Sequence, residues 1–257
     1  MGVRNPSGKL AETFAEQLSD IPSQPWFPGE HRQMQYREGL YVGYRYFDTA
    51  RKPVLFPFGH GLSYSHFDLP QVILSNDTLT AQRSVKLTVE VQNTGSMAGA
   101  EVVQVYRHCK NSLVHRPDQE LCGFAKVHLE AGASGSVEIQ LLPDSFQIFD
   151  HGTQNWILES GPVELRIGVS SRDIRLTKML NIASVDVPST LAAGVPWPEF
   201  LPADAGQGLA VSDFAFAQML NRPVPAPEAL RPFHRNSSVR EIGTTWLGAK
   251  IQAKFAD

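Results

Sequence analysis

The sequence has little cysteine, no long apolar run and no excess of positive charge, and each shortage excludes a class of protein. Two cysteines, Cys109 and Cys122, among 257 residues are too few for a disulfide framework. We expect free thiols, since a bond needs neighbouring strands with Cα atoms within about 7 Å. The formal net charge of −3 leaves no basic surface for nucleic acid or an anionic membrane. The lack of an apolar run of about 18 residues excludes a transmembrane helix.

A signal peptide is also missing. The first residues, MGVRNPSGKLAETFAEQL, contain no apolar core of the kind that a secretory signal requires. We therefore expect a cytoplasmic protein if the chain is complete. For a fragment, this absence says nothing about where the parent protein works.

Histidine and cysteine form no metal motif. His108, Cys109 and His115 lie close together in the sequence, but their spacing matches no standard zinc pattern. We expect neither a metal nor another cofactor.

The middle of the chain contains a series of short alternating segments. From residue 84 to 94, Val85, Leu87, Val89 and Val91 alternate with polar residues, as in a half-buried antiparallel strand. Further strands are predicted at 100–107, 124–129, 137–141, 156–159, 163–169 and 174–182. With turn signals about every ten residues, this series predicts a mainly β fold, an immunoglobulin-like antiparallel sandwich over residues 71–183.

The two flanks differ from this sandwich. Residues 1–70 show no clean alternation, and one short amphipathic helix is predicted at residues 10–18. Residues 184–257 form a proline-rich tail. There we expect a helix at 212–220, with Ser212 as N-cap and Phe214, Ala217 and Leu220 on one face, and a second helix at 238–255.

The most aromatic part of the chain lies between residues 36 and 67. These 32 positions hold nine aromatic residues other than histidine and two prolines. So many rings are rarely left at a surface, because large exposed apolar patches invite association. Pro57 fixes its own φ, and Gly59 and Gly61 allow close backbone approach. The segment has the composition of a junction packed between two structural units and lacks the features of a self-contained active site.

The same segment resembles a known family. EGLYVGYRYFD and FPFGHGLSYSHF are similar to the C-terminal region of glycoside hydrolase family 3, the β-glucosidase and β-xylosidase group. NPSGKL precedes them as in that family. GFAKVHLEAGASGSVEIQL, Trp156 and GPVELRIGVSSRDIRL resemble its fibronectin-III-like domain. The resemblance runs from about Asn5 to Leu176, and the tail resembles the family only loosely, through LNRPVPAP and the NSSVREI and TTWLGAKI runs.

The resemblance implies a structural role. Full-length relatives begin with a (β/α)₈ barrel that carries an aspartate nucleophile, followed by an α/β domain whose loop usually supplies the acid/base carboxylate. No position here matches the nucleophile motif, and the acid/base loop lies upstream of the family's counterpart of Asn5. Residues 1–70 thus resemble a remnant of the α/β domain with an aromatic linker, and we expect no catalytic residue in this chain.

Two carboxylates near aromatic residues, Glu38 and Asp48, are the candidates for chemistry. A glycosidase needs two carboxyl groups roughly 5–9 Å apart. We expect these two instead to form structural ion pairs or caps, with Arg37 and Arg45 as the nearest partners. A divergent hydrolase that uses Glu38 and Asp48 remains a weaker alternative.

The other polar candidates are expected to be structural. His60, between two glycines, is predicted to be a packed, hydrogen-bonded histidine. Ser63, Ser170 and Ser171 lie in no nucleophile-elbow motif, and residues 170–173 are predicted to form a turn with side-chain hydrogen bonds. Asn236 begins a glycosylation motif, which means little without a secretory signal.

Four aromatic residues could stack on the faces of sugar rings: Trp26, Phe27, Tyr36 and Tyr41. Packing in a core or an interface is the favoured interpretation. No ligand-binding residue is therefore assigned from the sequence.

Two functional hypotheses of different classes follow. The favoured one is the C-terminal structural part of a β-glucosidase-like enzyme that hydrolyses O-glycosyl bonds in carbohydrate metabolism. Its partners would be the catalytic barrel and α/β domain, in the same gene or a separate chain, or a second copy through residues 1–70. The alternative is a stand-alone carbohydrate- or protein-binding sandwich, which an exposed planar row of tryptophan and tyrosine would favour. The retained aromatic junction favours the first hypothesis, because a binding module alone has no obvious use for it.

Overall fold

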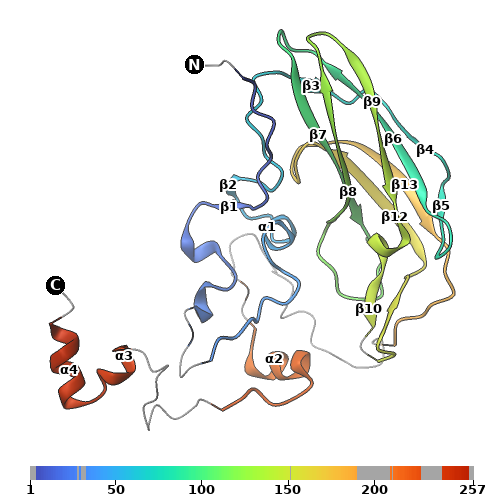
Figure 1. Ribbon diagram of the computed structural model, residues 1–257. Helices are drawn as coiled ribbons and strands as arrows, with labels where there is room; N and C mark the ends of the chain where they lie inside the picture. Colours follow the sequence, from blue (N-terminus) through green and yellow to red (C-terminus); the bar gives the residue numbers. More distant parts are fainter. Residues whose placement is uncertain are drawn as a thin grey trace.

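The central part of the chain is a sandwich of two β-sheets, seen at the upper right of Figure 1. The computed structural model describes residues 4–27, 29, 33–150, 152–189, 209, 211–226 and 239–254. One sheet has the strand order β5 (Thr78–Leu79), β13 (Ile174–Ile182), β12 (Gly161–Gly168), β7 (Gly99–His108) and β8 (Glu120–Leu129). Its neighbours are antiparallel, apart from the short parallel pair β5–β13.

The second sheet is built around β6 (Val85–Asn93). This strand pairs antiparallel with three others: β3 (Phe67–Asp68), β4 (Val72–Leu74) and β9 (Ser134–Leu141). The predicted immunoglobulin-like sandwich is therefore confirmed, and its long strands lie close to the predicted ranges. The short strands β3, β4 and β5 were not predicted, and the strand predicted at 156–159 lies outside the two sheets.

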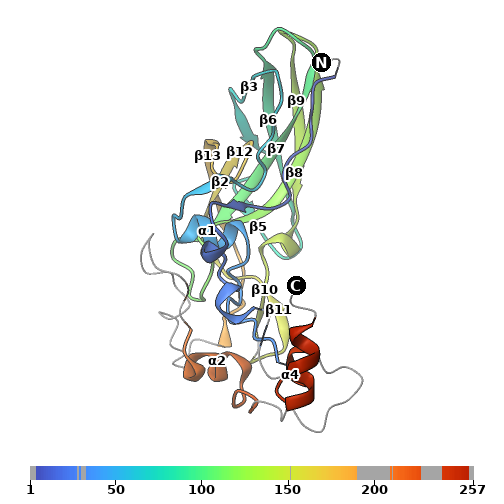
Figure 2. The same cartoon turned by 90° about the vertical axis from the view of Figure 1, so that its left-hand side faces the viewer.

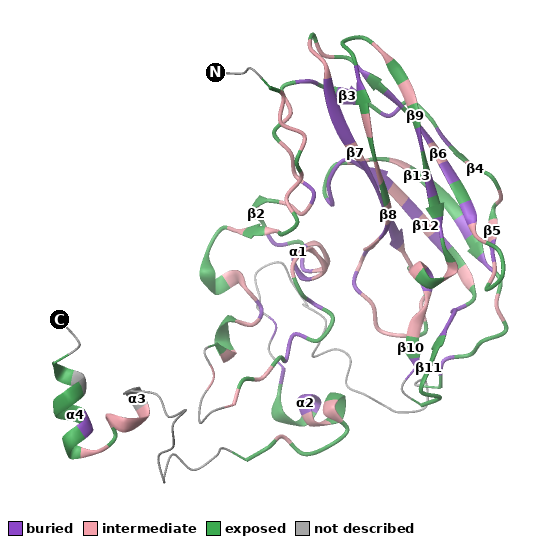
Figure 3. Ribbon diagram, viewed as in Figure 1, coloured by how far each residue is buried: buried purple, intermediate pink, exposed green. Residues whose placement is uncertain are grey.

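The alternation of β6 faces a core between the sheets. Val85, Leu87, Val89 and Val91 are fully buried, and the residues between them are exposed or half-buried. Leu165, Ile167 and Leu180 meet them from the other sheet. Figure 3 shows the alternation as buried stripes along the strands. β7 is buried on both faces, because the N-terminal segment (the described part of residues 1–66) covers its outer face.

Two short pairs of strands lie outside the sandwich sheets. β10 (Ile148–Asp150) and β11 (Asn155–Ile157) form an antiparallel hairpin that follows the 3₁₀ turn Pro143–Phe146. β1 (Phe14–Ala15) pairs with β2 (Val54–Phe56) in the N-terminal segment.

The helix predicted at residues 10–18 is wrong. Leu10 donates its backbone N–H to the carbonyl oxygen of His60 and accepts from Gly59, and β1 follows at once. Isolated helices this short are marginal, so pairing with the aromatic segment prevails. The helical structure here comes later, as 3₁₀ turns at Leu18–Asp20 and Gln24–Trp26 and as α1 (Tyr44–Thr49).

The tail contributes α2 (Asp213–Leu220), which begins where predicted. Ser212 is its N-cap and accepts a 3.1 Å hydrogen bond from the backbone of Ala215. Its buried residues are Ala215 and Phe216, whereas Phe214, one of the three residues predicted to share a face, is 65% exposed. Ala215 and Phe216 join a second core with Tyr41, Tyr46 and Phe47 of the N-terminal segment. Figures 1 and 2 both show α1 between the sandwich and α2.

The second predicted tail helix is divided in two. α3 (Val239–Ile242) ends in a turn in which Thr245 accepts a hydrogen bond from Gly248, and α4 (Trp246–Ala253) follows. Ser238 and Phe255, the predicted ends, lie outside the described residues. No helix in the described ranges is long and apolar enough to cross a membrane.

Candidate functional site at the junction with the sandwich

The aromatic segment forms the predicted junction against the outer face of β7. The ring of Tyr44 stacks on Phe58 with centroids 4.7 Å apart and meets Tyr106 of β7 edge-on at 5.8 Å. The Tyr44 hydroxyl accepts a 2.8 Å hydrogen bond from the backbone of Leu121 on β8. The rings therefore bind two neighbouring strands of one sheet to α1.

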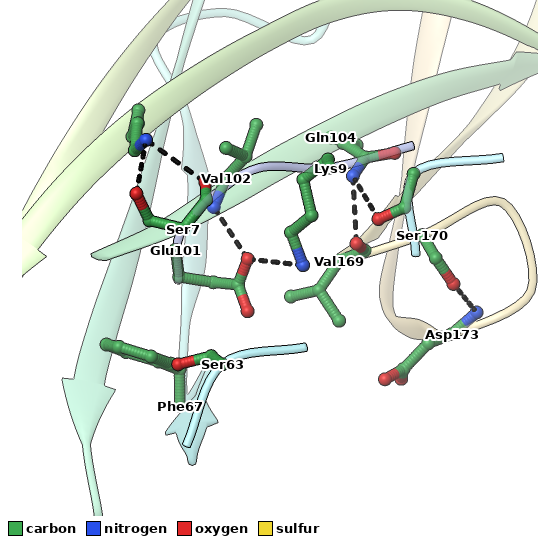
Figure 4. Close-up of polar contacts among 12 residues, drawn as sticks. Ser7, Lys9, Ser63, Phe67, Glu101, Val102, Gln104, Val169, Ser170 and Asp173 are labelled. Carbon is green, nitrogen blue, oxygen red and sulfur yellow. Dashed lines mark hydrogen bonds and ion pairs between the residues drawn. The ribbon is translucent and has the colours of Figure 1, made fainter. Parts of the chain in front are cut away.

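Gln104 is the buried centre of this junction (Figure 4). Its amide nitrogen donates to the carbonyl oxygens of Val169, at 2.8 Å, and Gly59, at 3.3 Å. Its amide oxygen accepts a 2.6 Å hydrogen bond from Tyr106. One side chain of β7 thus holds both the aromatic segment and the turn after β12.

A second contact lies at the beginning of the described chain. The Lys9 ammonium lies 2.6 Å from the Glu101 carboxylate, and both side chains are largely buried. Glu101 also accepts a 2.7 Å hydrogen bond from the backbone of Val102, and Lys126 donates to the Ser7 hydroxyl at 2.8 Å (Figure 4). These bonds fix the first described residues along β7 and β8.

Asp48 belongs to a third contact, with a residue far away in the sequence. The Arg172 guanidinium donates to the Asp48 carboxylate at 2.8 Å and to the carbonyl oxygens of Phe47 and Lys52. Gln119 donates to the other Asp48 oxygen at 3.1 Å. Burial raises the pKa of Asp48, and the hydrogen bonds from Arg172 and Gln119 oppose this. Asp48 thus forms an ion pair, as was expected for it.

The predicted partners of the two carboxylates are wrong. Arg45 lies 3.6 Å from Glu120, and Arg37 pairs with Asp213 of α2. Arg37 also donates to the Val211 carbonyl oxygen at 2.8 Å and lies over the ring of Trp26 at 3.9 Å. Both arginines therefore join different parts of the chain to the N-terminal segment.

Glu38 and Asp48 line different cavities. Asp48 lines an open polar cavity of about 490 Å³, together with Arg51, Asp118, Gln119, Arg166 and Arg172. Glu38 lines a separate cavity of about 360 Å³ between the N-terminal turns and α1. It is only 8% exposed, and its Oε2 atom has no hydrogen-bond partner among the described residues. The structure does not bring the two carboxylates together in one cleft.

The histidines and cysteines are dispersed. His60 packs against Phe56, with ring centroids 5.2 Å apart. His108 contacts the carbonyl oxygen of Asp118, and His115 meets Tyr41 edge-on at 5.2 Å. Burial lowers the pKa of His115 to about 4. In the described part of the chain, no three His, Cys, Asp or Glu side chains gather as they would around a metal ion.

Both cysteines are free thiols, as predicted. Burial raises the pKa of each, and Cys109 accepts a 3.2 Å hydrogen bond from Arg116. Neither environment favours the reactive thiolate.

The serines form turns. Ser170 accepts hydrogen bonds from the backbone of Arg172 and Asp173, which confirms the predicted turn. Ser171 donates its backbone N–H to the Phe58 carbonyl oxygen. Ser63 donates to the Asn5 side chain at 3.1 Å. Asn236 lies outside the described residues.

The four aromatic candidates do not form one platform. Tyr41 is fully buried, whereas Phe27 and Tyr36 are 69% and 65% exposed and Trp26 packs on Arg37. The structure contains a groove of about 470 Å³ that the sequence did not predict. Its lining includes Trp156, Phe149, Tyr41 and His115. Trp156 and Phe149 meet at 70°, so they present no planar row. Trp156 was recognised in the sequence, but its partner Phe149 is 7 positions away and only the hairpin brings them together.

Comparisons with known proteins place the sandwich in a family. Residues 101–171 match the model of the fibronectin type III-like domain. The thermostable beta-glucosidase B of Acetivibrio thermocellus is 44% identical over 183 residues, which are 71% of this chain and 24% of that protein. Beta-glucosidase BoGH3A of Bacteroides ovatus is 36% identical over 180 residues, 68% of this chain and 24% of that protein.

Solved structures give the same result. A GH3 beta-glucosidase from Bifidobacterium adolescentis superposes with a TM-score of 0.66 at 31% identity, over 98% of this chain and 31% of that chain. DesR, a beta-glucosidase from Streptomyces venezuelae, superposes with a TM-score of 0.65 at 37% identity, over 70% and 23%. The chain spans about a quarter of the length of the curated relatives that it matches.

Proposed function

Because this chain corresponds to the C-terminal region of the β-glucosidases of glycoside hydrolase family 3, fibronectin-III-like domain included, we propose that it serves such an enzyme as a structural part. The whole enzyme hydrolyses O-glycosyl bonds of β-glucosides in carbohydrate metabolism. The nucleophile and the acid/base carboxylate come from the rest of the enzyme, and this chain supplies no catalytic residue.

We assign a separate task in this role to each of three parts of the chain. Residues 71–183, preceded by the short strand β3, form the sandwich that buttresses an α/β domain. Residues 1–70 complete the end of that α/β domain and link it to the sandwich. Residues 184–257 form a tail that wraps over other surfaces. Within this tail, α2 packs against the N-terminal segment.

The junction is the observation that carries this proposal. Gln104, the Lys9–Glu101 pair and the Arg172–Asp48 pair all join the N-terminal segment to the sandwich, and each is wholly or partly buried. Buried polar networks whose members are satisfied hold one relative orientation. A buttress needs such a junction, because it has to hold a neighbouring domain in a fixed position.

The N-terminal segment also presents apolar surface to a partner. Leu18, Phe27 and Val42 are 74%, 69% and 57% exposed, and further large exposed side chains lie nearby in sequence: Phe14, Tyr36, Leu40, Leu55 and Leu62. Soluble monomers rarely leave much contiguous apolar surface uncovered. The barrel and α/β domain are the proposed cover, and a second copy of this chain is the alternative.

A chimera tests the proposal. This chain would replace the matching C-terminal region of the Acetivibrio thermocellus enzyme, and hydrolysis of aryl β-glucosides and β-xylosides would be measured. We expect activity within about tenfold of the parent, or about 1.4 kcal/mol of transition-state free energy, and none from this chain alone. A folded but inactive chimera would contradict the proposal. Activity of the chain alone that Glu38→Gln abolishes would identify a self-contained hydrolase.

A carbohydrate-binding module is the second candidate function. The groove of about 470 Å³ that Trp156 and Phe149 line supports it. Trp156 is 64% exposed at the edge of this groove, and exposed tryptophans stack well on sugar rings. The 70° angle between Trp156 and Phe149 argues against a platform for an extended glucan. Calorimetry with cello-oligosaccharides, using Trp156→Ala as the control, would detect such binding.

A further inference from the structure

Glu38 is a buried carboxylate that makes no ion pair within the described chain. The residue is 8% exposed, and no group in the described ranges donates a hydrogen bond to its Oε2 atom. Its sequence neighbour Arg37 instead pairs with Asp213 and donates a hydrogen bond to the Val211 carbonyl oxygen. Burying a carboxylate without a partner is costly, so native proteins rarely keep one.

The cavity beside Glu38 is lined by two carboxylates, three hydroxyl groups and no basic group. Its polar lining residues are Glu12, Thr13, Ser23, Glu38 and Tyr44, and no lysine, arginine or histidine lines it. The hydroxyl oxygen of Thr13 is also buried without a hydrogen-bond partner in the described part. Glu12 is exposed, so a second negative charge lies at the accessible side of the cavity.

The basic residues of the N-terminal segment that make ion pairs are engaged elsewhere. Lys9 pairs with Glu101 at 2.6 Å, Lys52 with Asp20 at 3.2 Å, and Arg45 with Glu120 at 3.6 Å. No ion pair in the described part of the chain includes Glu38, and no described basic residue lines its cavity, so we look for the compensating charge outside these residues.

The walls of the cavity suit the stem of a long side chain. Phe47, Phe58 and Val42 line it, and Val42 is 57% exposed. Lysine and arginine bury their methylene stems against apolar surface while the charged end makes polar contacts. A volume of about 360 Å³ leaves room for one such side chain.

We propose that this cavity is a socket for a lysine or arginine side chain of the rest of the enzyme, whose charge pairs with Glu38. The proposal rests on the proposed function and specifies its interface. Its occupant follows from charge complementarity and from the size of the relatives, about three-quarters of whose length lies outside the matched region. An ammonium or guanidinium group can donate to Glu38 and Thr13 at once.

The test uses Glu38→Gln in two settings, the isolated chain and the chimera described above. In the isolated chain this variant removes a buried carboxylate that has no ion-pair partner among the described residues, so we expect a melting temperature equal to or higher than that of the parent. In the chimera it deprives the incoming cation of its partner, so we expect the half-life of thermal inactivation to fall at least fivefold. Glu130→Gln, at an exposed residue of the sandwich, is the matched control for loss of one carboxylate.

The outcomes separate the two proposals. Opposite effects in the two settings would support the socket. Loss of stability in both would show that Glu38 serves only the fold of this chain, and an active chimera indifferent to Glu38→Gln would overturn the socket alone. An effect that depends on the concentration of the isolated chain would assign the cation to a second copy and overturn the proposal. A folded but inactive chimera would overturn the proposed function and the socket with it.

Discussion

At the scale of single residues, Gly59 is a point of close contact between the N-terminal segment and the sandwich. Its φ is +80°, and a Cβ atom there would collide with the amide group of Gln104. Gly59→Ala therefore adds a steric clash to the strain of a left-handed backbone, and we expect a loss of about 2–4 kcal/mol of unfolding free energy.

Gly132→Ala is the matched control for this prediction. Its φ is +74°, and nothing lies within 4 Å of the position of a Cβ atom. This variant should therefore lose only about 1 kcal/mol, the cost of the backbone conformation. Thermal unfolding of both variants measures the difference, and equal losses would show that the contact with Gln104 contributes nothing.

Asp150 gives a pH-dependent prediction at the same scale. Its carboxylate accepts hydrogen bonds from the Thr153 hydroxyl and the Ser189 hydroxyl, both at 2.7 Å, and these lower its pKa to about 2. A lowered pKa stabilises the fold above the unfolded-state pKa of about 3.9, and the contribution is lost as the pH falls towards 2. Asp150→Asn should thus be less stable than the parent at pH 7, and the difference should shrink between pH 4 and pH 2. A constant difference across urea titrations at these pH values would contradict the assignment.

Residues of this kind mark the limit of what the sequence could predict. The structural role of Asp48 was predicted, but the proposed partners Arg37 and Arg45 were chosen because they lie nearby in the sequence. The actual partner, Arg172, is 124 positions away. Only the packing of α1 against the turn after β12 brings the two charges together, and no local pattern encodes that contact.

At the scale of elements, the attachment of α2 depends on Arg37. This guanidinium is 3% exposed, pairs with Asp213 and lies over the rings of Trp26 and Phe216. Arg37→Lys keeps the charge but loses the planar stacking and the forked geometry. We expect a loss of about 1–3 kcal/mol, because the Asp213 side chain is largely solvent-exposed and its part of the interaction is screened.

Hydrogen exchange of the α2 amides is the direct measurement for this variant. Exchange at residues 213–220 should accelerate while that of β6 is unchanged. Lys86→Ala, which breaks an exposed ion pair with Glu138, is the control. It should cost under about 0.5 kcal/mol of unfolding free energy and leave exchange in α2 unchanged. Faster exchange throughout the chain would show that Arg37 serves the whole fold instead.

The strands were predictable and the N-terminal elements were not, for a physical reason. β6 and β9 bury one face each, so their side-chain alternation is written in the sequence. α1 has only six residues, and its fully buried Tyr46 and Phe47 are consecutive, which gives no helical period. Short elements that are held by tertiary contacts carry little local signal.

At the scale of the whole molecule, the two cores of the chain have different origins. The sandwich core is made almost entirely by residues from 67 to 182. The second core needs Tyr41 and Phe47 together with Leu209 and Phe216, from opposite ends of the described chain. The sandwich is therefore the part that can fold first, and the second core forms only when both flanks meet.

The start of the sandwich gives the last prediction. Phe67 and Leu69 are 4% and 6% exposed in the sandwich core, and β3 pairs with β6 at Phe67 and Asp68. A fragment of residues 71–183 lacks both side chains, whereas 66–183 keeps them. At about 1.5–3 kcal/mol for each buried side chain, the shorter fragment should lose about 3–6 kcal/mol. For a domain of this size that lowers the melting temperature by at least about 10 °C. Phe67→Ala in the longer fragment should account for roughly half of the loss. Equal melting temperatures of the two fragments would show that the sandwich begins at residue 71 and that β3 belongs to the junction.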